Sequence, residues 1–231
     1  MRSTPAIQTI PPLERRTLGE KVYAEMRELL VSGRLAPGER LSLRSAAEAL
    51  GVSIMPVREA VSRLIAERAL EVAPNRAVRV PLMSASQLKE LSVVRIAIEG
   101  FACEQAALRR TPDDLKRIAA AETAFRRESL SSRPDLAAAV EMNKDFHFAV
   151  YRASALPSLV EIIGGLWLKI GPVINLDLRE DPERLRTGGA FRCHAEMLAA
   201  IRQQDGARAK AALADDIGGA AAFILKRGGL N

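Results

Sequence analysis

The chain has 231 residues, 48% hydrophobic and 4% aromatic, so it is long enough for two domains with packed cores. Abundant Ala and Leu beside so few aromatic residues favour packed helices over sheet. Two cysteines exclude a disulfide framework and favour a reducing cytosol, and no apolar run is long enough to predict a membrane span. The net charge of +6 is consistent with a polyanionic partner.

Residues 1–16 contain three prolines and predict a flexible arm. A helix is expected over residues 17–32 and would end at Gly33, before a turn at Pro37-Gly38. Residues 1–81 carry 13 Lys and Arg against 9 Asp and Glu, so positive charge is denser here than in the rest of the chain.

Two short helices around a tight turn follow, the first over residues 43–50. Gly51 would end it in a conformation with positive φ, and the hydroxyl of Ser53 would cap the second helix. Pro56 falls in the first turn of that second helix, where a missing N–H costs little. With Arg58 facing outward, the pattern predicts a helix-turn-helix; a plain helical hairpin in a core is the alternative.

Two short alternating runs, residues 70–73 and 77–80, flank Pro74-Asn75-Arg76, which is a hairpin signal. A hairpin with a basic tip directly after a helix-turn-helix is typical of a wing. The sequence therefore predicts a winged helix-turn-helix, a DNA-binding module, over residues 17–81.

From Ser84 onward the chain reads as helix, without strand patterns or internal repeats. Glycine pairs and Pro172 predict a kink or break in the helix that starts near Pro157. Later helices are expected from Asp181-Pro182 to about Gln203 and from Gly206 to Lys226. Residues 84–231 thus predict an all-α antiparallel bundle of six or seven helices.

Several motifs, in order, resemble the N-terminal domain of the GntR superfamily of bacterial transcription regulators. They are Tyr23, Arg27 and Leu30, then Gly-Arg-Leu-Ala-Pro-Gly-Glu-Arg-Leu at 33–41, Gly-Val-Ser at 51–53 and Pro-Val-Arg-Glu-Ala at 56–60. The chain departs from the family at Ile54-Met55, where a polar pair such as Arg-Thr usually faces DNA. It also has Asn75 where the wing tip usually carries Gly, and Asn tolerates positive φ better than most residues.

The resemblance implies DNA contacts from the second helix and the wing. Arg44 and Arg58 would bind guanine edges or phosphates, and the wing tip would reach the minor groove or backbone. The full set of predicted DNA-binding residues is Arg44, Ser53, Ile54, Met55, Arg58, Asn75 and Arg76. With apolar Ile54 and Met55, readout is expected to depend more on DNA shape.

The helical part resembles the ligand-binding domain of the FadR-like branch, which carries an Asp-x-x-x-His metal motif and two later histidines. Asn143 and His147 match the first motif, His194 matches the next histidine, and Asp216 stands where the last would be. The resemblance implies a metal set of Asn143, His147, His194 and Asp216 for one divalent ion, Zn²⁺, Ni²⁺ or Mn²⁺. The alternative is a polar pocket in which both imidazoles bond an organic acid directly.

Arg95 and Glu99 lie one helical turn apart. In the family this Arg points into the cavity and holds a carboxylate, whereas the alternative is an ordinary surface pair. Glu99 is expected to be structural, and Trp167 to pack in the core or a dimer interface. The predicted effector-binding residues are Arg95, His147, Asn175 and His194.

The sequence therefore predicts a homodimeric transcription regulator of the bacterial cytosol and nucleoid, most often a repressor in this family. It would bind an operator in double-stranded DNA and respond to a small organic acid. Two alternatives remain at this point. One is a metal-dependent hydrolase, although the chain has no Glu-x-x-His pair. The other is an architectural DNA-binding protein whose bundle senses no effector.

Overall fold

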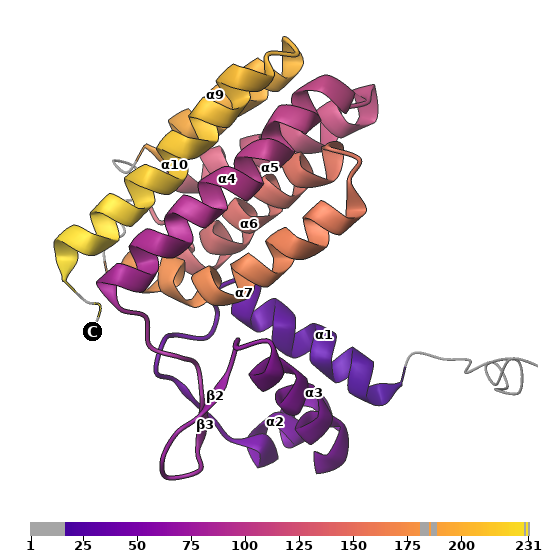
Figure 1. Ribbon diagram of the computed structural model, residues 1–231, viewed down its shortest axis with the longest axis vertical. Coiled ribbons are helices and arrows are strands. Elements are labelled where there is room, and N and C mark those ends of the chain that lie inside the picture. The colour runs from indigo at the N-terminus through magenta and orange to yellow at the C-terminus, as the bar shows by residue number, and fades with distance from the viewer. Residues whose placement is uncertain (1–16, 181–184, 186–188, 229, 231) are drawn as a thin grey trace, which may run out of the picture.

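The computed structural model describes residues 17–180, 185, 189–228 and 230, and no side chain is described for residues 175–180. The predicted flexible arm, residues 1–16, lies outside the described residues. The described chain forms a small winged part below a larger helical bundle (Figure 1). This arrangement confirms the predicted mainly α fold.

The winged part contains three helices and a small sheet. Its elements are α1 (Leu18–Val31), β1 (Arg40–Leu41), α2 (Leu43–Leu50), α3 (Ile54–Ala66), β2 (Glu71–Val72) and β3 (Val78–Arg79). The strands are antiparallel in the order β1-β3-β2, so Arg79 lies between Arg40 and Glu71. The sequence prediction missed β1, because a two-residue strand beside a turn has no periodicity to detect.

The predicted end of α2 and the predicted outward face of α3 are confirmed. Gly51 ends α2 in the left-handed region, with φ 64°. Val57 and Leu64 on α3 are fully buried and pack into the core with α1. The apolar stripe of α3 therefore fixes the helix on the domain and leaves its opposite face to solvent.

Two local expectations were wrong. Ser53 stands at the N-cap of α3, but its hydroxyl makes no capping hydrogen bond. The capping hydroxyls of Thr17 and Ser42 bond the N–H of the third helical residue, which in α3 is Pro56 and has no N–H. At the wing tip the positive φ of 63° belongs to Arg76 and not to Asn75, whose Oδ1 accepts a hydrogen bond from the N–H of Ala77 at 3.2 Å.

The bundle contains six helices in the described residues. They are α4 (Ala85–Arg109), α5 (Pro112–Ser129), α6 (Leu136–Ala153), α7 (Pro157–Glu180), α9 (Ala190–Arg202) and α10 (Gly206–Arg227). Helix α10 packs against α4 and α9, and α5 packs against α6 and α9. The largest fully buried side chains are Trp167, Tyr151 and Phe146, so these three aromatic residues lie in the centre of the bundle.

Of the predicted kink or break in α7, the break is wrong, because the helix continues through its glycines and through Pro172. Two of these glycines lie against α1. A Cβ on Gly171 would stand 2.2 Å from the carbonyl oxygen of Leu30, and one on Gly164 would stand 2.3 Å from the guanidinium of Arg27. The glycines therefore provide a flat helix face for the winged part instead of ending the helix.

Within α7, the stretch Pro157–Ile174 is long and apolar enough to cross a membrane by length and composition, with a mean hydropathy of 1.4. In the fold this helix packs against α1, α4 and α6. Core packing on three sides accounts for its apolar composition.

The structure describes the later part of the helix predicted from Asp181-Pro182 to about Gln203. Helix α9 starts at Ala190, after Gly189, which has φ 81°. The predicted start at Asp181-Pro182 lies outside the described residues. Helix α10 has nearly the predicted bounds.

Candidate functional site

Three of the four predicted metal ligands converge inside the bundle. One ligand atom each from His147, His194 and Asp216 lies within 4.8 Å of the others. Nε2 of His147 is 3.2 Å from Oδ2 of Asp216, and Nε2 of His194 is 3.9 Å from its Oδ1. The three side chains come from α6, α9 and α10, so only the packing of these helices brings them together.

A small cavity of about 60 Å³ lies at this cluster. Arg95 and Asn143 line it together with His147 and Asp216. The predicted fourth ligand, Asn143, is therefore at the site and partly buried. Asn175, the remaining predicted effector residue, lies among those whose side chains the structure does not describe.

Glu99 is the centre of the polar network beside the cavity. Its carboxylate accepts two hydrogen bonds from the guanidinium of Arg95, at 2.6 and 3.1 Å. It also accepts a short hydrogen bond from the hydroxyl of Tyr151 and one of 3.3 Å from the indole of Trp167. Because Glu99 is completely buried, these donors are its compensation for lost hydration.

The network also fixes the imidazole of His147. The hydroxyl of Tyr151 gives its proton to Glu99, and burial beside that carboxylate holds the pKa of Tyr151 well above its ordinary value. The same hydroxyl lies 3.1 Å from Nδ1 of His147, from which it can only accept. Nδ1 therefore carries a proton, and Nε2 faces Asp216, the orientation of a histidine that binds a metal through Nε2.

His194 lies between aromatic rings and makes no hydrogen bond to any described residue. Its imidazole stacks on Phe146 at 4.0 Å between centroids and lies 4.7 Å from Phe125. Burial lowers the pKa of His194 to about 3, so the ring is neutral. Both of its nitrogens are buried without a hydrogen-bond partner, which is a costly arrangement for a polar ring.

Asp216 gives the cluster its negative charge. Burial alone would raise the pKa of Asp216, but the hydrogen bond from His147 and the nearby imidazoles and Arg95 bring it below the ordinary value. Two imidazoles and one carboxylate in a buried space are a donor set that fits a divalent cation.

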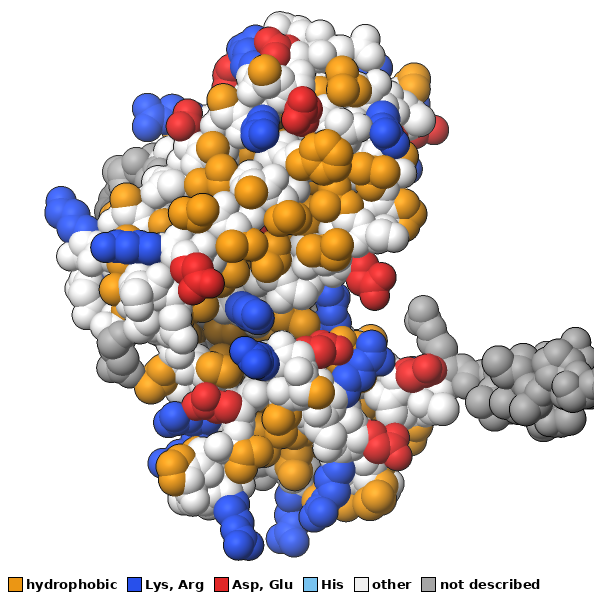
Figure 2. Space-filling model, viewed as in Figure 1, with side chains coloured by type: hydrophobic (Ala, Val, Ile, Leu, Met, Phe, Trp, Pro, Cys, Tyr) orange, Lys and Arg blue, Asp and Glu red, His pale blue; other side chains and the backbone are white. Residues whose placement is uncertain are grey.

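The predicted DNA contacts lie together on the winged part, away from the bundle. All of them are exposed: Arg44, Ser53, Ile54, Met55, Arg58, Asn75 and Arg76. Among the described residues, Arg44 and Arg58 make no ion pair, so both guanidinium groups are free to bind phosphates or bases. Figure 2 shows Lys and Arg side chains projecting from the end of the winged part that is remote from the bundle.

Two residues of the bundle site were missed as polar partners. Tyr151 follows His147 by one helical turn, so the sequence did contain a signal for their contact. Trp167 was expected only to pack, and its burial confirms the core position, but its hydrogen bond to Glu99 had no local signal. That bond joins α7 to α4 across the bundle.

Comparisons with known proteins cover both parts of the chain. Residues 18–80 match the gntR family of bacterial regulatory proteins, and residues 90–218 match the FCD domain. The chain is 36% identical over 155 residues to the HTH-type transcriptional regulator McbR of Escherichia coli strain K12, covering 67% of this chain and 69% of that protein. It is 24% identical over 191 residues to the HTH-type transcriptional repressor RspR of the same strain, covering 82% and 81%.

The solved structure of E. coli McbR/YncC has the same fold. It superposes with a TM-score of 0.84 at 31% identity, covering 92% of this chain and 99% of that one. These relatives are transcription regulators, which excludes the predicted hydrolase alternative. The chain belongs to the GntR family of bacterial transcription regulators, in the FadR-like group with an FCD domain, and is a ligand-responsive DNA-binding protein and not an enzyme.

Proposed function

We propose that this protein is a homodimeric repressor that acts in the bacterial cytosol on the nucleoid and is controlled by a short organic acid. In this proposal residues 17–81 bind DNA and residues 84–231 bind the effector and dimerise. The repressor role is supported by the similarity to RspR, which is named a repressor. The exposed arginines of α2 and α3 would contact the operator, with Ser53 and the wing tip on its backbone.

The convergence of His147, His194 and Asp216 is the observation that carries the effector site. A divalent Zn²⁺, Ni²⁺ or Mn²⁺ held by these residues would give His194 the partner that it lacks, with Asn143 as a weak neutral ligand at the rim. The ion would supply positive charge for a carboxylate. The alternative, in which the imidazoles bond the acid directly, uses the same residues.

Arg95 and the small cavity together favour an anionic effector of small size. It lines the cavity while Glu99 takes two of the five N–H groups that a guanidinium offers, which leaves others for a ligand. The cavity volume of about 60 Å³ is far below the roughly 300–1,000 Å³ of pockets for drug-sized ligands. A short acid is therefore favoured over a long one, with Asn175 as a further predicted contact.

Two direct contacts connect this site to the DNA-binding part. Lys144 stands next to Asn143 on α6 and forms an ion pair with Glu28 on α1. Helix α7 carries Trp167 to the Glu99 network and lies with Gly171 against the end of α1. A ligand that shifts α6 or α7 would move α1, and it would control DNA binding if it favoured one placement over another.

An unpartnered apolar face supports the homodimer. Val93, Phe101 and Leu108 follow α4 at helical spacing, with 69%, 45% and 54% of their surface exposed. Figure 2 shows hydrophobic side chains gathered over the bundle on this side. A second copy related by two-fold symmetry would cover both faces and set the two recognition helices on paired half-sites.

Elemental analysis and native mass spectrometry of the full chain, purified without a His-tag and loaded with Zn²⁺, Ni²⁺ or Mn²⁺, test the proposal. We expect a dimer mass and one ion per chain, lost in Asp216→Asn. The matched control is Asp215→Asn, an exposed neighbour on the same helix, which should keep the ion. Equal metal content in both variants would contradict the metal site.

Thermal shift with acetate, glycolate, malate and citrate separates the remaining possibilities. Stabilisation that is lost in Arg95→Gln supports an acid effector, with or without metal. An unchanged melting temperature with every acid would favour the architectural alternative, in which the bundle binds no effector. Operator DNA selected from a random pool then reports whether the stabilising acid weakens binding, as a repressor released by its effector requires.

A further inference from the structure

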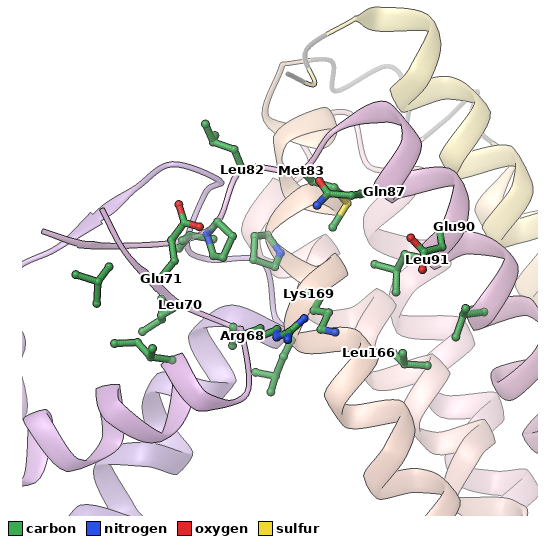
Figure 3. A pocket seen from close by; sticks show the side chains of 18 residues that line it. Arg68, Leu70, Glu71, Leu82, Met83, Gln87, Glu90, Leu91, Leu166 and Lys169 are labelled. Atoms are coloured by element: carbon green, nitrogen blue, oxygen red, sulfur yellow. The ribbon is translucent and has the colours of Figure 1, made fainter. Parts of the chain in front are cut away.

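A second and larger cavity separates the winged part from the bundle. Its volume is about 640 Å³, which lies in the range of small-molecule sites. We call it the interdomain groove. One wall comes from the end of α3 and from β2, and the other from the start of α4 and the middle of α7 (Figure 3). The groove shares no lining residue with the cavity at His147.

Two cations meet in the interdomain groove. Figure 3 shows the guanidinium of Arg68 and the ammonium of Lys169 pointing toward each other from opposite walls. Among the described residues neither side chain has an ion-pair partner. Two like charges that face each other without a counter-ion form a place where an anion gains from both.

The acidic residues of the groove do not neutralise this pair. Glu71 is bound to Arg79, whose Nε lies 2.6 Å from its carboxylate. Glu90 stands on α4 and makes no ion pair within the described part of the chain. In the described part of the groove, a free cationic pair therefore stands beside a single free carboxylate, Glu90, which shares the bundle wall with Lys169.

The rest of the lining is largely apolar. Leu70 and Val80 come from the winged part, and Met83, Leu91 and Leu166 from the linker and bundle. Figure 2 shows hydrophobic side chains inside the hollow between the two parts, with Lys and Arg side chains at its rim. A fully hydrated inorganic ion gains nothing from such walls, whereas an apolar body does.

We propose that the interdomain groove is a second ligand site, for an amphipathic organic anion. Its carboxylate lies between Arg68 and Lys169, and its aliphatic or aromatic body covers the leucines of both walls. Because the walls belong to the two parts of the molecule, the ligand holds the winged part at one angle to the bundle. Helix α7 contributes to both sites, through Lys169 here and Trp167 at the Glu99 network.

Isothermal titration calorimetry of the full chain with octanoate tests the proposal. Octanoate carries both parts of the expected ligand, acetate lacks the apolar body, and 1-octanol lacks the charge. We expect octanoate to bind at least about tenfold more tightly than either. The double variant Arg68→Asn with Lys169→Gln should weaken octanoate at least tenfold; Asn suits residue 68, whose φ is 58°.

The control Lys89→Gln removes an exposed cation of α4 outside the groove and should leave octanoate binding unchanged. Asp216→Asn should also keep it, so failure of the metal proposal and failure of this one are distinguishable. Circular dichroism verifies that each variant is folded. Absence of octanoate binding to the wild type, an unchanged affinity in the double variant, or a loss in Asp216→Asn would each overturn the proposal.

Discussion

The winged part and the bundle use their polar residues in opposite ways. Arg44 and Arg58 are exposed and unpaired among the described residues, whereas Arg95 is buried and bound to Glu99. Arg44 and Arg58 need no partner side chain for their role, whereas the hydrogen-bond network of Arg95 includes residues of α6 and α7. Removing a DNA-facing residue should therefore cost affinity, and removing a pocket residue should cost stability first.

Glu99→Gln gives the largest expected effect. The variant leaves the buried guanidinium of Arg95 without its counter-charge and disturbs the bonds from Tyr151 and Trp167. We expect a loss of about 3–5 kcal/mol in the free energy of unfolding, measured by urea denaturation. Glu90→Gln on the same helix is exposed and should change it by less than about 0.5 kcal/mol. Similar losses in both variants would refute the central role of Glu99.

Gly171→Ala tests the contact between the two parts. The added Cβ would lie 2.2 Å from the carbonyl oxygen of Leu30, so α1 and α7 must separate. A loss of roughly 1–3 kcal/mol is expected, together with faster proteolysis of the winged part. Gly165→Ala adds a methyl group that meets no atom within 4 Å and should stabilise the helix by about 0.5–1 kcal/mol. A loss of stability in Gly171→Ala with a gain in Gly165→Ala would show that close packing against α1, and not helix propensity, requires glycine at residue 171.

Arg58→Ala tests the exposed arginine of α3. Its guanidinium has no partner in the described structure, so unfolding should be nearly unchanged. Operator binding, measured by fluorescence anisotropy, should weaken by about 1–3 kcal/mol, and a lost phosphate contact should lower the salt slope by about one. Lys116→Ala removes an exposed cation of α5 and should alter neither quantity. Operator affinity equal to that of the wild type would contradict the helix-turn-helix interface.

Ser53→Ala has the smallest expected effect and compares two helix N-caps of the winged part, Ser53 and Ser42. Because Ser53 caps nothing, unfolding should change by less than about 0.5 kcal/mol. Ser42→Ala removes a hydroxyl that accepts from the N–H of Ser45 at 3.2 Å and should cost about 1 kcal/mol. If Ser53 contacts a phosphate, its loss weakens operator binding by about 0.5–1.5 kcal/mol. A large stability loss in Ser53→Ala would show that the hydroxyl caps α3 after all.

Local sequence patterns were enough to predict the winged domain and the bounds of most helices. Gly51 and the apolar stripe of α3 each act within a few turns of the chain, so a local sequence pattern is enough to predict them. Even the missing cap of Ser53 could be read locally, since Pro56 lacks the N–H that the capping bond needs. Resemblance to a family added the candidate ligands His147, His194 and Asp216 as separate positions.

Tertiary structure alone decided what those positions do together. His147, His194 and Asp216 come from three different helices, and the Glu99 network joins a fourth helix, α4, to α7. The distances between these side chains therefore depend on packing between segments far apart in the chain. The glycines of α7 look like helix breakers in sequence, because the close approach of α1 that they permit is visible only in space. The interdomain groove likewise has no linear signal, since its cations face each other from the two parts of the molecule.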